Sequence, residues 1–343
     1  MALEKSVLTQ TVIAGLLREH YGLQVQSVQK TALGSANCYR LSCVEGDFFL
    51  KEFQSKFSPD DLIREAELCN FLWAKDFPVA RFLHTKNGGV YIEYQGHLFC
   101  LETFIDGETY GYTGLPESLF PEMARTLGQL HRTLQGYPLP ESMGRAWLAA
   151  YSPEEQAARY DALLELAEKN PEDPHYEALC GELNYKKELS LRCGKYQKYF
   201  DGITYASTHG DYQGCQLIWD GNEIKAVIDF SSACTLPAVW EVMRSFVQTS
   251  GGSRQQAALD VVGLCAYVGE YMKVSPLTRT DLAAMPYVYL FQLARSAFGY
   301  REYLTGDSED REELLQFAAW RTAMCREVEA KAERLSQALI HLA

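Results

Sequence analysis

The stretch THGDYQGCQLIWDGNEIKAVIDF, residues 208–230, combines a short acidic segment with two apolar runs. The two runs flank Asp220-Gly221-Asn222, a combination typical of a tight β-hairpin turn. Asp211 precedes the first run and Asp229 ends the second, so a hairpin would turn the chain and bring both carboxylates to one cleft. An ordinary hairpin with acids at its turns gives the same local pattern. The rest of the chain must therefore decide between a phosphate and metal site and a structural hairpin.

The spacing of the polar residues in this stretch favours phosphoryl-transfer chemistry. Gln216 follows Asp211 by five positions, the spacing between Asp and Asn in the kinase catalytic loop H-R-D-x-x-x-x-N. Asp229-Phe230-Ser231 then takes the place of D-F-G. In such sites one carboxylate orients or deprotonates the acceptor hydroxyl, and oxygen ligands hold Mg²⁺ against the phosphates. The pattern predicts the first role for Asp211 and metal binding for Asp229 and Gln216.

The first hundred residues contain a matching set of nucleotide-binding candidates. Gly34 and Ser35 lie in a small-residue turn between two β-like runs, and the strand FFLKEF contains Lys51. A lysine inside an apolar strand needs an anionic partner, which Glu65 on the following helix can supply while the ammonium holds the α- and β-phosphates. Each residue also has a structural explanation: Gly34 shapes a hairpin, Lys51 extends from an edge strand, and Glu65 is a solvated charge. The order of all three before the acidic stretch favours the nucleotide site.

The periodicity of the chain predicts two different halves. Residues 7–20 have helical spacing, residues 25–53 form short β-like runs, Ser58-Pro59-Asp60-Asp61 begins a second helix, and residues 88–108 return to strand character. After residue 107 the chain is helix-periodic except for the hairpin. We expect an α+β fold with a nucleotide-binding antiparallel-sheet lobe at 1–104 and a mainly helical lobe at 105–343, which contains the catalytic loop and the substrate pocket.

The composition is that of a globular protein of 343 residues with 47% hydrophobic residues. A formal charge of −13 argues against nucleic acid as a partner. The ten cysteines form no C-x-x-C pair, which predicts that most are small buried apolar residues. The N-terminus lacks signal-peptide character and no apolar run reaches membrane-spanning length, so we expect a cytoplasmic protein with no membrane partner. We expect the protein to be a monomer or a homodimer.

The chain resembles the aminoglycoside phosphotransferase family, a branch of the protein-kinase-like superfamily that includes choline, homoserine and spore-coat-associated kinase-like proteins. The resemblance covers nearly the whole chain and is carried by HGDYQGCQ, AVIDFSSACTLPAVWEV, FFLKEF, REAELCNFL, FPVARFL and LGQLHRTL. It implies a two-lobed protein-kinase-like fold that uses ATP and Mg²⁺, with Asp211 as the catalytic base, Gln216 and Asp229 as metal ligands, and Lys51 with Glu65 as the phosphate-positioning pair. CLETFIDGE resembles the interlobe hinge, where backbone groups near Thr103 and Ile105 would bind the adenine edge.

Two positions depart from the family pattern. Gln216 replaces an asparagine, and the extra methylene changes the reach of an amide oxygen toward a metal that demands strict octahedral geometry. Glu241 replaces an aspartate, a change that keeps the charge and that we expect to affect local packing. For His209 and His131 the motif context favours structural hydrogen bonding over catalysis.

The sequence therefore predicts a small-molecule kinase that transfers the γ-phosphate of ATP to a hydroxyl group. Acidic residues in the helical half, among them Asp260, Glu270, Asp281 and the cluster 307–313, would suit an aminoglycoside or another amino-bearing alcohol, although the cluster is also typical of a solvated surface. A nucleotide-binding pseudokinase is the alternative suggested by Gln216. A metal-dependent hydrolase that uses His209, Asp211 and Asp229 would leave Lys51 and Glu65 unexplained.

Overall fold

The structure is a computed structural model that describes residues 6–31, 36–112, 114–306 and 310–343. The chain forms two compact units. The sheet unit comprises the chain up to Thr109 together with residues 216–232, and the helical unit comprises residues 110–215 and 233–343.

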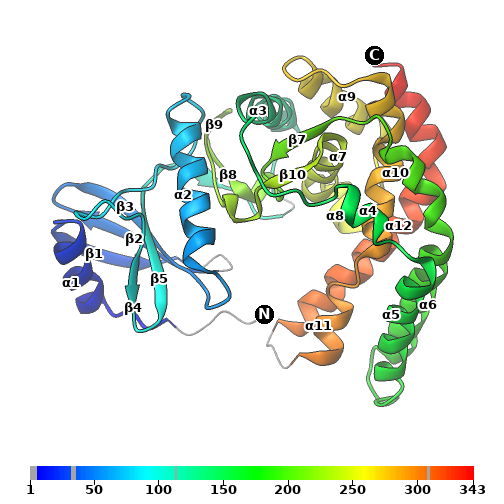
Figure 1. Ribbon diagram of the computed structural model, residues 1–343, viewed down its shortest axis with the longest axis horizontal. Coiled ribbons are helices and arrows are strands. Elements are labelled where there is room, and N and C mark those ends of the chain that lie inside the picture. The colour runs from blue at the N-terminus through cyan, green and yellow to red at the C-terminus, as the bar shows by residue number, and fades with distance from the viewer. Residues whose placement is uncertain (1–5, 32–35, 113, 307–309) are drawn as a thin grey trace. The chain divides into compact units, whose positions relative to one another are not determined.

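A five-stranded antiparallel sheet in the order β1-β2-β3-β5-β4 forms the centre of the sheet unit (Figure 1). A smaller sheet, β6-β8-β9, belongs to the same unit. The helices and strands of the sheet unit are α1 Gln10–His20, β1 Val25–Lys30, β2 Asn37–Cys43, β3 Gly46–Glu52, α2 Pro59–Trp73, β4 Ile92–Tyr94, β5 His97–Thr103, β6 Glu108–Thr109, β8 Leu217–Asp220, β9 Glu223–Val227 and the 3₁₀ turn η4 Phe230–Ser232.

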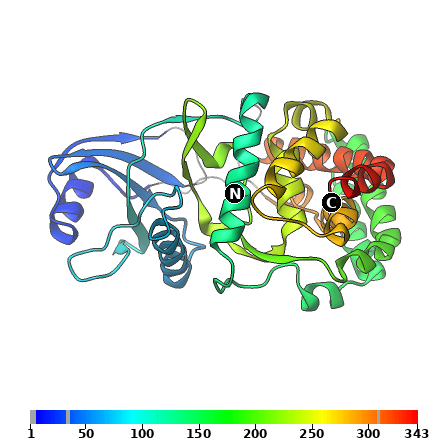
Figure 2. The same ribbon diagram turned by 90° about the horizontal axis from the view of Figure 1, so that it is seen from above.

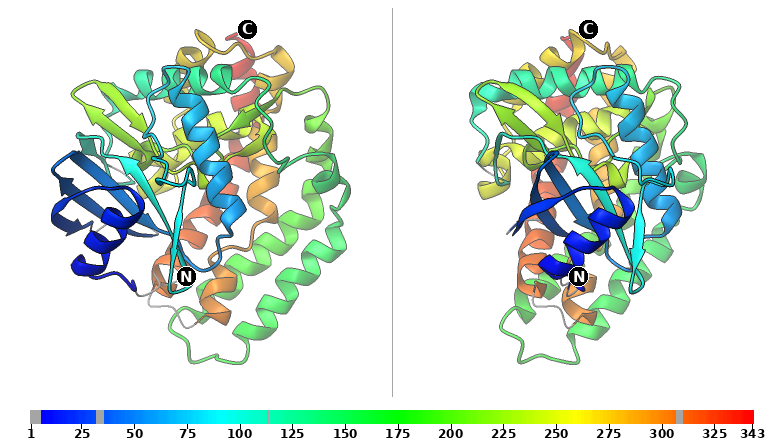
Figure 3. Two further views of the ribbon diagram at one scale, coloured as in Figure 1. Left: turned by 60° about the vertical axis from the view of Figure 1, so that its left-hand side comes forward. Right: turned by 90° about the vertical axis from the view of Figure 1, so that its left-hand side faces the viewer.

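The two faces of the larger sheet carry different side chains because successive residues of a strand point to opposite faces. Leu50 of β3 packs with Leu41 of β2 and Leu101 of β5 against Leu17 of α1. Lys51, the next residue of β3, points to the opposite face and contacts α2 through Glu65. Figure 3 shows α1 and α2 beside this sheet. The helix α2 begins where the sequence predicts, because Ser58 and Asp61 form a reciprocal capping box ahead of it.

The hairpin predicted at residues 217–227 is confirmed. Strands β8 and β9 pair antiparallel from Leu217 and Val227 to Asp220 and Glu223. Gly221, the first residue of the two-residue turn, has φ +58°, a conformation that glycine adopts without steric cost.

The helical unit is built around helices α3, α7, α9, α10 and α12, seen from above in Figure 2. A second cluster packs α5 and α6 against α11 through Tyr160, Leu183, Tyr300 and Tyr303. The elements of the unit are η1 Glu117–Leu119, α3 Phe120–Thr133, α4 Arg145–Ala149, α5 Pro153–Ala167, α6 Tyr176–Arg192, η2 Cys193–Phe200, β7 Tyr205–Thr208, η3 Gly214–Gln216, β10 Cys234–Pro237, α7 Ala238–Thr249, α8 Gly251–Gln256, α9 Val261–Met272, α10 Arg279–Arg295, α11 Tyr300–Thr305 and α12 Arg311–Ile340.

The expected combination of an antiparallel-sheet part and a mainly helical part is confirmed. The packing nevertheless assigns the hairpin and Asp229 to the sheet unit, whereas the sequence grouped residues 105–343 together. The physical reason is the pairing of β8 with β6 and the backbone hydrogen bond from Val227 N–H to the Pro78 carbonyl, 2.9 Å. The sequence also assigned nucleotide binding to residues 1–104 and substrate binding to residues 105–343. This division of roles stays a prediction.

A search of the described residues for a helix long and apolar enough to span a bilayer finds none.

Candidate active site

Lys51 is the centre of the charged group in the sheet unit. Its Nζ lies 3.3 Å from Glu65 Oε1 and 3.3 Å from Asp229 Oδ1. The side chains of Lys51 and Glu65 are 13% and 4% exposed, whereas that of Asp229 is 30% exposed. One ammonium thus joins a buried carboxylate to a solvent-accessible one. The pairing of Lys51 with Glu65 expected from the sequence is present, and Asp229 joins it although it lies 178 residues further along the chain.

Glu102 is a fourth charged residue of this group, and sequence reasoning missed it. It lies two positions after Cys100, the β5 residue that pairs with Lys51, so it shares the sheet face of the lysine. Burial raises the pKa of the Glu102 carboxyl to about 8; Lys51 opposes this, and the charges of Glu65 and Asp229 add to it. Burial alone would lower the pKa of Lys51, but Glu65, Asp229 and Glu102 raise it well above its usual value. The signal was available, because a glutamate in the apolar run LFCLE needs a partner as much as Lys51 does.

Buried cysteines surround the charged group, as the sequence predicted for most of the thiols. Cys38, Cys69 and Cys100 are all buried, and burial raises the pKa of each thiol. They therefore act as small apolar neighbours and leave the carboxylates as the anionic partners of Lys51.

The hairpin places Gln216 and Asp229 at the same end of its two strands. The Gln216 carbonyl accepts a hydrogen bond of 3.0 Å from the N–H of Ile228, the residue before Asp229. Asp229 adopts φ +64°, a left-handed conformation that is uncommon for residues other than glycine and is often found at functional sites. Its Oδ1 also accepts a 2.8 Å hydrogen bond from Ser231 Oγ. A carboxylate and an amide are oxygen ligands that suit Mg²⁺ when phosphates and water supply the remaining oxygens. The described residues contain no cluster of three or more His, Cys, Asp or Glu that could hold a metal alone.

The loop that carries Asp211 lies in the helical unit and is fixed by Glu241. The Glu241 carboxylate is fully buried and accepts hydrogen bonds from the backbone N–H groups of Gly210, at 2.5 Å, and His209, at 3.2 Å. Its Oε2 lies 2.8 Å from His131 Nε2, and His131 Nδ1 lies 2.7 Å from the Tyr271 hydroxyl. Burial acts to raise the pKa of Glu241, but the hydrogen bond and charge of His131, the charge of His209 and the Gly210 N–H outweigh it and lower the pKa.

The role of Glu241 therefore differs from the one that the sequence suggested. It was expected to affect local packing, whereas the structure makes it the anchor of the loop that presents Asp211. The structural roles expected for His209 and His131 agree with these contacts: the backbone N–H of Asp211 donates to His209 Nδ1 at 3.2 Å, and His131 holds the Glu241 carboxylate. A glutamate in the apolar helix AVWEVM was the available signal.

Arg244, one helical turn after Glu241 on α7, forms an ion pair with Asp211 through Nη2 and Oδ1. The side chain of Arg244 is 16% exposed. Sequence reasoning did not single out this arginine, because nothing in its local pattern links it to a loop 33 residues earlier.

The expected adenine-binding segment follows β5. The Thr103 N–H donates to the Arg81 carbonyl at 2.9 Å, and its hydroxyl accepts from the Arg81 N–H at 3.0 Å, so these groups are committed within the protein. Among the described residues, no backbone–backbone hydrogen bond of Ile105 is found, and its role at the adenine edge stays a prediction. Gly34 and Ser35 lie outside the described residues, and the strands that flank them pair antiparallel up to Lys30 and Tyr39.

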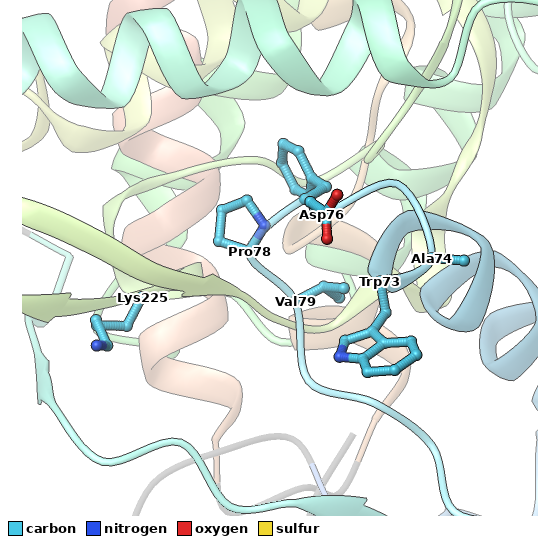
Figure 4. Close-up of a pocket in the computed structure, with 7 residues that line it drawn as sticks. Trp73, Ala74, Asp76, Pro78, Val79 and Lys225 are labelled. Carbon is cyan, nitrogen blue, oxygen red and sulfur yellow. The ribbon is translucent and has the colours of Figure 1, made fainter.

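A pocket of about 460 Å³ lies elsewhere in the sheet unit, between the C-terminal end of α2 and β9 (Figure 4). It is lined by Trp73, Ala74, Asp76, Phe77, Pro78, Val79 and Lys225. None of the site residues predicted from the sequence contributes to it.

The acidic residues that suggested a cationic acceptor have partners within the protein. Asp281 is buried and accepts hydrogen bonds from Thr204 and Thr278. Glu270 pairs with Arg125 at 2.7 Å and with Lys273 at 2.5 Å, and Asp260 caps α9 by accepting from the Val262 N–H. Asp307 and Glu309 of the acidic cluster lie outside the described residues. Asp260, Glu270 and Asp281 thus have structural roles.

Comparison with known proteins identifies the family. The model of the phosphotransferase enzyme family matches residues 29–277. The chain belongs to the phosphotransferase enzyme family. The similarity to the aminoglycoside phosphotransferases and the prediction of a phosphotransferase with a hydroxyl acceptor are confirmed at this level.

The fold is shared with solved phosphotransferases at low sequence identity. A spectinomycin phosphotransferase in complex with ADP and spectinomycin matches with a TM-score of 0.63 and 14% identity, covering 94% of this chain and 100% of that one. An amicoumacin kinase in complex with AMP-PNP, Ca²⁺ and Ami has a TM-score of 0.59 and 14% identity, with 94% of each chain covered. A microcompartment-associated aminopropanol kinase has a TM-score of 0.61 and 16% identity over 98% of this chain and 100% of that one. The comparison with curated proteins found no match.

Proposed function

We propose that this protein is an ATP-dependent small-molecule kinase that transfers the γ-phosphate of ATP·Mg²⁺ to a hydroxyl group. The observation that carries the proposal is the position of Lys51, whose ammonium contacts the buried Glu65 and the more exposed Asp229. Two fixed carboxylates hold one cation where it can meet phosphate oxygens, and one of those carboxylates is the predicted metal ligand.

The nucleotide-binding role rests on the sheet unit. Lys51 would neutralise charge on the α- and β-phosphates, Glu65 would hold the lysine in place, and the Gly34-Ser35 turn would cover the phosphates. Asp229 and the Gln216 amide oxygen would hold Mg²⁺, which neutralises charge developing on the transferred phosphoryl group. Backbone groups near Thr103 and Ile105 would bind the adenine edge. The nucleotides named in the solved spectinomycin and amicoumacin kinases support this assignment by analogy.

Asp211 would act on the acceptor. Its carboxylate would orient the acceptor hydroxyl and take its proton as the oxygen–phosphorus bond forms and the bond to the bridging oxygen of ADP breaks. Glu241 would keep the loop of Asp211 in register through the N–H groups of His209 and Gly210. These roles fit one reaction, phosphoryl transfer to a hydroxyl group. The free thiols of the described cysteines support a kinase that works in the cytoplasm.

The acceptor class is less constrained than the reaction. The related solved kinases act on spectinomycin, amicoumacin and aminopropanol by name, so an aminoglycoside or another amino-bearing alcohol belongs in the first group of acceptors to test.

The test is Mg²⁺-dependent ADP formation by the purified full-length protein across aminoglycosides, amino alcohols, hydroxy acids and sugar phosphates. We expect one class to stimulate ADP formation. Asp211→Asn should lower turnover by about 10²-fold or more while leaving ATP affinity unchanged. Equal turnover in the Asp211→Asn variant would remove Asp211 as the base.

A pseudokinase that binds nucleotide without turnover remains the second candidate, and the observation in its favour is Gln216. The hairpin fixes the backbone of this residue, so the longer side chain has to reach the metal from an asparagine position. ATP binding without ADP formation for any acceptor, unchanged by Gln216→Asn, would favour this candidate.

A further inference from the structure

The charges of three arginines of the helical unit act together on one buried tyrosine. Two of these arginines, Arg254 and Arg321, also lie over the same ring, that of Phe317, at 5.3 and 5.6 Å. Arg244 lies on α7, Arg254 on α8, Arg321 on α12 and Tyr289 on α10, helices that lie in the bundle at the right of Figure 1. Tyr289 is 1% exposed. Burial raises the pKa of Tyr289 to about 12, and the charges of Arg244, Arg321 and Arg254 all act on it in the opposite direction. The four side chains therefore form one electrostatic group, termed here the arginine cluster.

Several hydrogen-bond donors of the arginine cluster are unsatisfied. Arg244 Nη1, Arg254 Nε and the Tyr289 hydroxyl are buried and have no hydrogen-bond partner among the described residues. Arg321 donates from Nη1 to Ser296 Oγ at 2.9 Å. Within the described chain, Arg244 is ion-paired with Asp211, and no ion pair joins Arg254 or Arg321 to a carboxylate.

Aromatic rings hold the free guanidinium of Arg254 in a fixed orientation. Its Cζ lies 4.3 Å from the ring centre of Trp320, 5.1 Å from Tyr112 and 5.3 Å from Phe317. Trp320 is itself anchored by a 2.6 Å hydrogen bond from Nε1 to the Ser253 carbonyl. Stacking uses the faces of a guanidinium and leaves its N–H edges free, which preorganises the group for a planar or tetrahedral anion.

A purely structural role explains this arrangement poorly. Two other arginines of the helical unit have carboxylate partners: Arg192 donates two bonds to Glu329 at 2.9 and 2.8 Å, and Arg125 pairs with Glu122 and Glu270. In the arginine cluster, burial lowers the pKa of Arg321 and of Arg254, and the charge of Arg244 lowers both further. Like charges gathered around unsatisfied buried donors are unfavourable until an anion binds.

We propose that the arginine cluster binds an anionic group of the acceptor, a carboxylate or a phosphate ester. The inference rests on the proposed kinase function and narrows its acceptor class. Arg244 connects the two roles, because one of its terminal nitrogens contacts Asp211 while the other is free. An anion bound to the free nitrogen lies about one guanidinium width from the base, so the hydroxyl and the anionic group of the acceptor are separated by few bonds.

The first experiment measures anion binding without any turnover. Inorganic phosphate is titrated into the full-length protein by calorimetry, with thermal unfolding followed in parallel. We expect saturable binding that Arg254→Gln, Arg321→Gln and the milder Tyr289→Phe each weaken, the arginine variants by at least 10-fold. Arg192→Gln is the matched control because its donors are already satisfied by Glu329, and it should bind phosphate as the wild type does.

Two results would overturn the proposal: no saturable binding of phosphate, or a loss of binding in Arg192→Gln equal to that in the arginine-cluster variants. A second experiment measures ADP formation with matched acceptors, 4-hydroxybutyrate against its amide and glucose 6-phosphate against glucose. The first pair tests a carboxylate and the second pair tests a phosphate ester. The charged member of at least one pair should give the higher kcat/KM, and Arg254→Gln should remove this difference. Equal rates within both pairs in an active enzyme would refute the anionic acceptor. Phosphate binding with no ADP formation for any acceptor would refute the kinase function and leave the anion site standing.

Discussion

Replacing Glu241 by glutamine tests the network that holds the Asp211 loop. The substitution keeps the shape of the side chain and removes its charge. It also puts an NH₂ group in place of one oxygen, so the amide cannot accept from His131, the His209 N–H and the Gly210 N–H as the carboxylate does. Removing one partner of a buried charged network costs about 3–5 kcal/mol of folding stability. We expect Glu241→Gln to lose stability of that order.

The same substitution should affect catalysis through the position of Asp211. Misplacing a reacting group by about 1 Å can cost about 10²-fold in rate. We therefore expect kcat to fall by about 10- to 10²-fold, with the KM for ATP unchanged, because the residues assigned to ATP lie in the sheet unit.

The assay combines denaturant unfolding at pH 7 with steady-state kinetics. Glu270→Gln is the control, since its partners Arg125 and Lys273 form partly exposed pairs worth about 0–1 kcal/mol. The pKa of Glu241 is lowered in the folded protein, so its contribution is present above its usual value of 4.5 and is lost as the pH falls below that value. The difference between wild type and Glu241→Gln should shrink accordingly in acid. A loss below about 1 kcal/mol at pH 7, or a change in the KM for ATP alone, would refute the anchoring role.

Three further predictions concern the sheet unit. Lys51→Ala should remove the cation that pairs with the 4% exposed Glu65 and lower the free energy of unfolding by about 3–5 kcal/mol, measured by denaturant unfolding. It should also lower kcat/KM for ATP by about 10²-fold in an assay of ADP formation. Wild-type kinetics in this variant would contradict the phosphate role. Gln216→Asn should keep or improve Mg²⁺-dependent activity in a metal titration, and complete loss would show that the longer amide is adapted to this site. Glu102 has a pKa raised from 4.5 to about 8, so the stability that its protonated form provides is full below pH 4.5 and is lost as the pH rises toward 8. Glu102→Gln should therefore flatten the pH profile of unfolding in that window, with at most about 1.4 kcal/mol per pH unit removed, and an unchanged slope would contradict the shifted pKa.

The arginine cluster changes how the charge of the protein should be interpreted. The net charge of −13 and the scattered acids of the helical half favoured a cationic acceptor. Total charge says little about a local site, because Asp260, Glu270 and Asp281 are all engaged in caps or ion pairs. Arg244, the ion-pair partner of Asp211, carries an unsatisfied cationic donor at Nη1. Local pairing, which the composition does not contain, determines the sign of charge that a ligand meets.

The sequence by itself determined the elements and the chemical types of the site residues. The capping box of Ser58 and Asp61, the Gly221 hairpin turn and the alternation in FFLKEF are local patterns, since caps, turns and strand faces depend on residues a few positions apart. The Lys51–Glu65 pair could also be predicted, because a buried lysine requires an anion and the next helix offers one.

Only the tertiary structure decided which distant residues meet. The contact of Asp229 with Lys51, the anchoring of the Asp211 loop by Glu241 and the joint action of the charges of Arg244, Arg254 and Arg321 on Tyr289 join segments far apart in the chain. The packing also assigned the hairpin to the sheet unit, through pairing with β6 that no local pattern encodes. The physical reason is that a polar residue in an apolar segment indicates that it needs a hydrogen-bonding or charged partner when buried. Which residue becomes that partner depends on how the elements pack.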